Sequence, residues 1–153
     1  MGILWLSLLA RDLLQVAFSG TVLVPDLALL ALVWLSVFRC EEPGSLFIHA
    51  FWVGLLWDLR WTGVPGMTSA SYVLVTAVTA WVWSSLPPGR RTNPVLFFFW
   101  SSAAHALTSV FPAVFTSKGL GLSSSLATQQ GMAIACVLGL TALYIRYRRS
   151  HHE

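Results

Sequence analysis

Charged residues are scarce in this chain. Nine basic and six acidic residues make up 10% of its 153 residues, whereas a typical soluble domain carries about 25%. Three stretches, 61–89, 92–117 and 119–145, contain no Asp, Glu, Lys or Arg. Each is longer than the ~20 apolar residues with which a helix crosses a bilayer. This composition excludes a soluble enzyme and a disordered chain, and it predicts an all-α polytopic membrane protein.

Net charge and cysteine content are low as well. The formal net charge of +3 is too small and too scattered for a nucleic-acid-binding surface, so we expect no nucleic-acid partner. Cys40 and Cys136 lie far apart and have no metal-ligand spacing nearby, so we expect two free thiols, no metal and no cofactor. The first residues lack the basic region and cleavage site of a signal peptide, and we expect them to form a retained membrane helix.

Turn-forming residues divide the chain into six apolar segments, which predict one domain over 1–153, a bundle of six transmembrane helices. The expected helices are roughly 3–20, 24–39, 44–60, 67–86, 94–116 and 125–146. Pro87 and Pro88 form the sharpest break, and Asn93 before Pro94 is typical of a helix start. If both termini are cytoplasmic, most arginines fall on the cytoplasmic side, which predicts an N-in/C-in multi-pass protein.

One face of the first segment is polar. Ser7, Arg11, Gln15 and Ser19 recur every four residues, and Asp12 stands beside Arg11. A charged side chain at the centre of a membrane helix costs ~2.5–3.5 kcal/mol by insertion measurements. Two interpretations remain open. The face is a buried polar seam that docks other helices or a partner, or the register is shifted and both charges reach an interface.

Two more polar residues interrupt apolar segments. Asp58, two residues before Arg60, could bind a cation, relay protons or anchor the following loop, and we favour a structural role. His105 shares a helix face with Ser101 and Ser109, but no carboxylate or thiol lies at ligand spacing from it. We therefore favour a neutral, hydrogen-bonded histidine at a helix contact over a metal ligand.

Two runs predict helix surfaces. Gly131, Ala135 and Gly139 have the four-residue spacing that lets helices approach closely, within the protein or with a partner. The aromatic run 97–100 is too bulky for such packing, and we favour lipid contact over a partner groove. The sequence contains no nucleophile–base pair, phosphate-binding loop or zinc-protease motif, so we expect no enzyme.

A longer pattern points to a family. Pro25-Asp26 opens an apolar helix, and Gly54-Leu55-Leu56-Trp57-Asp58 follows, with Gly66 after it. In these motifs, and in its length and six-segment layout, the chain resembles the rod shape-determining protein MreD family over nearly all of its residues. One departure is Ala50, which stands where the family's pattern has its first glycine.

The resemblance implies a non-enzymatic scaffold subunit of the bacterial cell-elongation complex in the inner membrane. Its fold would be similar to the substrate-binding subunits of energy-coupling vitamin transporters. The implied partners are MreC by direct contact, then MreB, RodA and a penicillin-binding transpeptidase in the same complex, besides membrane lipid. The expected partner-binding or structural polar face comprises Ser7, Arg11, Asp12, Gln15, Pro25, Asp26, Gly54, Asp58, Gly66 and His105.

Two alternatives remain open. The chain could be the small-molecule-binding subunit of an energy-coupling transporter. Such subunits usually carry Ala-x-x-x-Ala in the first helix, whereas here Leu14 follows Ala10 at that spacing. A proton-linked intramembrane enzyme that uses Asp58 and His105 is the other possibility.

Overall fold

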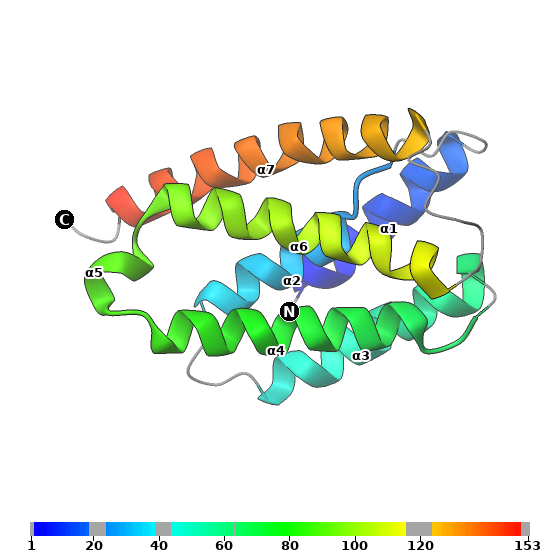
Figure 1. Cartoon of the computed structure of the whole chain (residues 1–153), viewed down its shortest axis with the longest axis horizontal. Helices are drawn as coiled ribbons and strands as arrows, with labels where there is room; N and C mark the ends of the chain where they lie inside the picture. Colours follow the sequence, from blue (N-terminus) through cyan, green and yellow to red (C-terminus); the bar gives the residue numbers. More distant parts are fainter. Residues whose placement is uncertain (1, 19–23, 39–43, 63, 116–123, 151–153) are drawn as a thin grey trace.

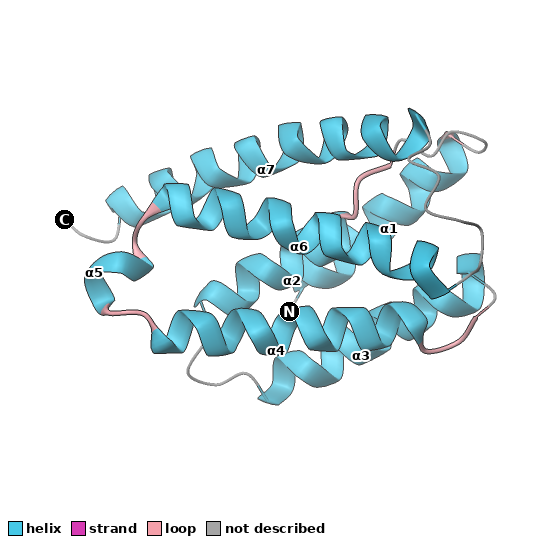
Figure 2. Cartoon of the chain, in the orientation of Figure 1, coloured by secondary structure: helices cyan, strands magenta, loops and turns pink. Residues whose placement is uncertain are grey.

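A computed structural model describes residues 2–18, 24–38, 44–62, 64–115 and 124–150, with the backbone alone for 110–115 and 124–128. In this part of the chain the fold is all-α, without strands (Figure 2). The elements are α1 (Gly2–Ala17), α2 (Leu27–Phe38), α3 (Gly44–Trp57), the π-helical turn η1 (Asp58–Thr62), α4 (Met67–Ser85), α5 (Pro88–Arg91), α6 (Pro94–Phe115) and α7 (Ser124–Ser150). The six longer helices run roughly along the long axis and alternate in direction (Figure 1).

The centre of the bundle is α2, which packs against α1, α3, α4 and α6. Its sequence LALLALVWLSVF is apolar on every side, and such a helix is stable only when it is surrounded. Leu29, Leu32 and Val33 are completely buried. The core therefore forms around the shortest of the long helices.

Side chains before α2 and α6 cap their first turns. The Asp26 carboxylate accepts a hydrogen bond from the backbone N–H of Leu29 at 3.0 Å. Asn93 Oδ1 accepts one from Val95 N–H at 2.9 Å, and Pro94 is the first helical residue. Proline costs little there, because that N–H has no partner within the helix. The predicted start of the helix after Asn93 is confirmed.

Several predicted helix bounds need correction. The break at Pro87 and Pro88 exists, but Pro88 begins the short helix α5, since proline is tolerated in a first turn. The last helix continues past the predicted end at 146 to Ser150. The third helix changes to π-helix at Asp58, and the second begins only at Leu27, after its cap. The predicted end of the first helix, at 20, lies outside the described residues.

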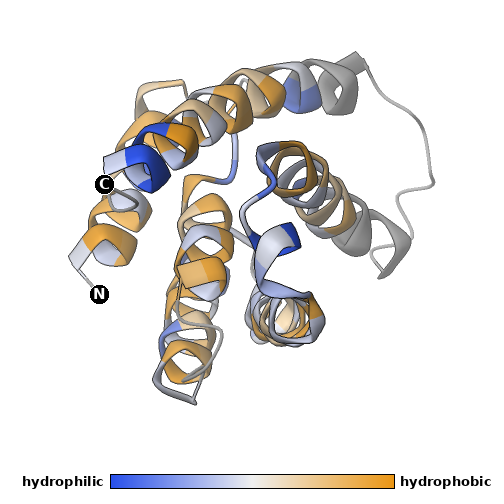
Figure 3. Cartoon of the chain, turned by 90° about the vertical axis from the view of Figure 1, so that its left-hand side faces the viewer, coloured by the Kyte–Doolittle hydropathy of each residue, from blue (hydrophilic) through white to orange (hydrophobic). Residues whose placement is uncertain are grey.

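Among the described helices, one segment is long and apolar enough to cross a membrane by length and composition, Gln129–Ser150 of α7. The helices α1, α2 and α3 contain 16, 12 and 14 residues, fewer than the ~20 of a typical span. Most of the helical ribbon is coloured as apolar, and strongly hydrophilic residues occur at α5 and at the C-terminal end of α7, among other places (Figure 3). The fold is thus all-α with a candidate membrane span.

The prediction that the whole aromatic run 97–100 faces lipid is wrong for Phe97. This ring is completely buried and stacks on Tyr144 of α7, with centroids 4.6 Å apart. Phe99, by contrast, is 64% exposed. Consecutive residues point about 100° apart around a helix, so a run of four covers every face and one ring must point inward.

The small residues of α7 do not pack within the described bundle. Gly131, Ala135 and Gly139 are all exposed, and a Cβ atom at either glycine would meet no other atom within 4 Å. Internal packing is therefore the wrong interpretation of this stripe. A partner helix remains the other interpretation.

Candidate functional site

Arg11 of α1 and Asp26, just before α2, form a buried ion pair. Nη1 of Arg11 lies 3.0 Å from Oδ1 of Asp26, and each side chain is 10% exposed. The Tyr72 hydroxyl of α4 lies 2.7 Å from both carboxylate oxygens, donates to them, and accepts a hydrogen bond from Arg11. The guanidinium also lies over the ring of Trp57, 3.5 Å from its centroid. Residues of α3, of α4 and of the start of α2 thus meet around one arginine of α1.

His105 of α6 extends this cluster. Its Nε2 accepts a hydrogen bond from the backbone N–H of Asp26 at 3.1 Å, and its Nδ1 lies 3.2 Å from Oε1 of Gln130 in α7. Because Nε2 is an acceptor, the ring proton belongs on Nδ1, where it is donated to Gln130. The arrangement therefore assigns a neutral imidazole, completely buried between helices.

The buried network formed by Arg11, Asp26, Tyr72, His105 and Gln130 connects α1, α4, α6 and α7 to the start of α2. A buried charge is tolerated when it is paired and hydrogen-bonded, whereas removal of one partner leaves the other uncompensated. Most of the polar atoms in the network form hydrogen bonds or ion pairs with one another. The arrangement is suited to hold helices in one register.

Asp58 holds the loop that joins α3 to α4. Its carboxylate accepts hydrogen bonds from the backbone N–H groups of Thr68, at 2.9 Å, and Ser69, at 3.4 Å, and from the Thr62 hydroxyl, at 3.0 Å. The side chain is completely buried. A carboxylate at this place accepts hydrogen bonds from N–H groups that have no partner within the helix. The positive end of the α4 dipole also stabilises its negative charge. The structure places Asp58 in a helix cap within the chain.

The two glycines of the motif surround that cap. A Cβ atom on Gly54 would lie 2.5 Å from Cα of Ser69, so α3 and α4 touch backbone to backbone there. Gly66 immediately precedes α4 with a φ of 92°, in the left-handed region that glycine adopts without steric cost. The motif from Gly54 to Gly66 thus builds the α3–α4 junction.

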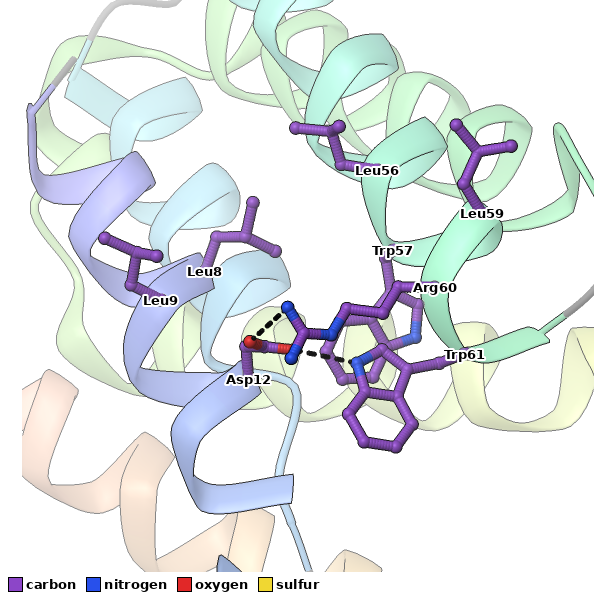
Figure 4. A pocket seen from close by; sticks show the side chains of 8 residues that line it. All are labelled: Leu8, Leu9, Asp12, Leu56, Trp57, Leu59, Arg60 and Trp61. Atoms are coloured by element: carbon purple, nitrogen blue, oxygen red, sulfur yellow. Dashed lines mark hydrogen bonds and ion pairs between the residues drawn. The ribbon is translucent and has the colours of Figure 1, made fainter. Parts of the chain in front are cut away.

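Asp12 lies on the side of α1 next to Arg11 and faces the π-helical turn. Its Oδ2 lies 3.0 Å from Nη1 of Arg60, and its Oδ1 accepts a hydrogen bond from the indole of Trp61 at 2.8 Å (Figure 4). The Arg60 side chain is 59% exposed. The two adjacent charges of α1 therefore have different surroundings, one inside the bundle and one at its surface.

A small polar cavity of about 150 Å³ adjoins the buried network. It is lined by Arg11, Asp26, Trp57, Thr62, Thr68, Ser71, Tyr72, Thr108, Ser109 and Gln129. Nε of Arg11 is buried and has no hydrogen-bond partner among the described residues. Pockets for small molecules usually measure ~300–1,000 Å³, so this cavity suits a few waters, each with a share of ~30 Å³ in the liquid.

The buried network does not include the remaining predicted site residues, Ser7, Gln15 and Pro25, and Ser19 lies outside the described residues. The Ser7 hydroxyl donates to the carbonyl of Leu4 in its own helix, at 2.7 Å. Gln15 is half-buried. The Pro25 carbonyl accepts a hydrogen bond from Leu27 N–H. Of the polar face predicted on α1, Arg11 is the member that enters the buried network.

Two members of the buried network were missed from the sequence, Tyr72 and Gln130. Each is a polar group inside an otherwise apolar segment, and that placement was the available signal. Polar side chains buried among apolar ones need partners, so they would have been reasonable candidates for contact with Arg11 or His105.

The described residues offer no group of three or more His, Cys, Asp or Glu side chains that could hold a metal ion. Cys136 is a half-buried free thiol, and Cys40 lies outside the described residues. The chemistry of the site is thus ion pairing and hydrogen bonding between helices.

Comparisons of the chain with protein-family models, curated proteins and solved structures found no match.

Proposed function

We propose that this chain is a non-enzymatic scaffold subunit of the bacterial cell-elongation complex, a six-span N-in/C-in protein of the inner membrane. The observation that carries the proposal is the buried network, whose polar groups are paired with one another rather than directed at a substrate. A subunit of this kind presents a rigid surface to its partners. The choice of this complex rests on the resemblance of the sequence to the MreD family.

The distribution of exposed residues supports a membrane location. Leu6, Leu13 and Trp81 are 68%, 69% and 70% exposed, and exposed apolar residues of this kind occur on most of the helices. Arg90 and Arg91 lie at the same end of the bundle as the basic end of α7. Basic residues gathered at one end favour that end in the cytoplasm.

The partner surface that we propose is the apolar groove beside α1. It measures about 470 Å³ and is lined by Ile3, Leu6, Ser7, Ala10, Leu27, Leu30, Ala31, Trp34, Cys136, Leu140 and Leu143. Its small residues, Ser7, Ala10 and Ala31, allow a second backbone to come close. We place the membrane helix of MreC here, with MreB, RodA and the transpeptidase reached through MreC.

This proposal moves the expected partner contact away from Arg11 and Asp58. Both side chains are buried and paired with groups inside the chain, so they position helices instead of touching a partner. The cavity beside the buried network measures about 150 Å³, below the volume of usual ligand sites, so the network itself gives no support to the vitamin-transporter alternative.

The test is co-purification of MreC with the full chain in mild detergent. Ala10→Trp fills the groove and is expected to abolish recovery of MreC. The matched control is Ala103→Trp on α6, where the alanine is exposed and outside this groove. Recovery of MreC at wild-type yield with Ala10→Trp would contradict the docking surface. Recovery of a transporter coupling subunit in place of MreC would favour the alternative function.

A further inference from the structure

A second groove separates α1 from α3 and η1 (Figure 4). It measures about 500 Å³ and is lined by Leu8, Leu9, Asp12, Leu56, Trp57, Leu59, Arg60 and Trp61. Leu9, Leu56 and Leu59 are 59%, 46% and 65% exposed. Of the eight lining residues, the two charged ones stand together, with the Trp61 indole beside them. The groove is therefore apolar along its walls and polar at one place.

Side-chain contacts join the two sides of this groove and flank it. Trp5 and His49, which precede the lining residues on α1 and α3, meet edge to face with ring centroids 6.3 Å apart. Further along α1, Asp12 pairs with Arg60. The bridging residues Trp5 and Asp12 of α1 are seven positions apart, which is about 10 Å at 1.5 Å per residue. A helix is ~10–12 Å wide, so a transmembrane helix would not fit between two contacts that are about 10 Å apart. An acyl chain is thin enough to lie between them.

The polar end has a defined chemistry. A guanidinium has five N–H donors in a planar fork, and Arg60 directs Nη1 to Asp12 while its side chain remains 59% exposed. The exposed edge suits a phosphate, whose oxygens match the planar fork of a guanidinium. Asp12 balances the charge of Arg60, so the pair as a whole is neutral and matches a headgroup that carries both a cation and an anion. The tryptophan beside the pair is a residue typical of membrane interfaces.

We propose that the α1–η1 groove binds a phospholipid with a phosphate and a primary ammonium in its headgroup, as in phosphatidylethanolamine. One acyl chain lies against Leu8, Leu9 and Leu56, the phosphate contacts Arg60, and the ammonium contacts Asp12. The inference rests on the membrane location in the proposed function. It does not depend on MreC, whose proposed groove lies on the other side of α1.

Native mass spectrometry of the full chain tests the site. The protein is purified in detergent, delipidated, and titrated with phosphatidylethanolamine or with phosphatidylglycerol, which has a phosphate but no ammonium. We expect phosphatidylethanolamine to bind about tenfold more tightly, the ratio that one charge-assisted hydrogen bond supplies. Arg60→Gln is expected to weaken this binding about tenfold, and Leu9→Trp, which fills the groove, to abolish it.

Matched controls separate the site from general lipid contact. Arg90→Gln changes an exposed arginine of α5, and Leu138→Trp changes a leucine of α7 that is 56% exposed. Both are expected to bind lipid as the wild type does. Equal affinity for the two lipids, unchanged by Arg60→Gln, would overturn the proposal. A Leu9→Trp protein that still binds lipid but no longer recovers MreC would also overturn the proposal.

The two proposals fail in different ways. If the wild type never recovers MreC but still selects phosphatidylethanolamine through Arg60, the scaffold function is wrong and the lipid site stands. If MreC is recovered and lipid selectivity is absent, the lipid site alone is wrong. The melting temperature of each variant in detergent shows whether Leu9→Trp has kept the fold, and the exposed Arg60→Gln supplies an answer if it has not.

Discussion

The two ends of α2 are held by different contacts. An ion pair lies at its N-terminal end, and a cluster of aromatic rings lies at its C-terminal end. The polar end joins Asp26 to Arg11, Tyr72 and His105 by direct hydrogen bonds. At the aromatic end, Trp34 packs edge to face on Phe97, with centroids 5.9 Å apart. The same helix is thus anchored by two different kinds of contact.

The difference lies in what each kind of contact specifies. Lipid is as apolar as leucine, so apolar burial alone does little to choose one helix arrangement over another in a membrane. A buried charge is stable only in an arrangement of helices that places a counter-charge beside it. Aromatic stacking tolerates small shifts, because its energy changes gradually with offset. We infer that the polar end sets the register of the helices and the aromatic end adds packing.

The largest effect should come from the polar end. Asp26→Asn keeps an acceptor for the α2 cap but leaves Arg11 buried without a counter-charge. We expect a loss of about 3–5 kcal/mol in stability, the usual cost of breaking a buried pair on one side. Thermal unfolding in detergent measures this loss.

Two comparisons show whether charge is the cause. Asp12→Asn removes a carboxylate from the surface pair with Arg60, whose guanidinium is 59% exposed, and ~0–1 kcal/mol is expected there. The double change Arg11→Met with Asp26→Asn should recover part of the loss, because no charge is left unpaired. Equal destabilisation by Asp26→Asn and Asp12→Asn would contradict a special role for the buried network.

An intermediate effect is expected where α3 meets α4. The Cβ atom added by Gly54→Ala would lie 2.5 Å from the Ser69 backbone, which must move. Overpacking of this kind costs about 1–3 kcal/mol, again measured by thermal unfolding. Gly139→Ala is the matched control on α7, where a Cβ meets nothing within 4 Å. It should be neutral or slightly stabilising, because alanine favours helix. If both variants behave alike, close backbone contact is not what Gly54 provides.

The sequence predicted helices and faces better than it predicted partners. The start of α6 followed from Asn93 and Pro94, because capping depends on neighbouring residues. The polar face of α1 correctly identified Arg11 as unsuited to lipid. Its partner Tyr72 stands 61 positions away, and Asp26 and His105 are 79 positions apart. Helical spacing indicates which side a residue faces but not which helix lies opposite.

The wrong predictions have physical reasons as well. The α7 stripe left packing within the protein open beside a partner helix, and the described bundle shows no such packing, because small residues permit close approach without requiring it. A break with two prolines suggested a loop, yet proline fits a first turn, and α5 begins at Pro88. Arg91 then donates to the carbonyls of Ser84 and Leu86 and satisfies the end of α4. These contacts depend on the tertiary path of the chain, which local rules do not contain.

The smallest effect should come from the aromatic end. Phe97→Leu keeps an apolar side chain but removes the ring stacked on Tyr144, a contact worth about 0.5–1.5 kcal/mol beyond the area buried. Tyr144 keeps its hydrogen bond to the Arg91 carbonyl, 2.6 Å long, which holds α7 beside α5 without the stack. Phe99→Leu, at a ring 64% exposed, is the control and should leave the melting temperature unchanged. If Phe97→Leu cost as much as Asp26→Asn, the aromatic cluster would also determine the arrangement of the helices, and the two ends of α2 would be equivalent.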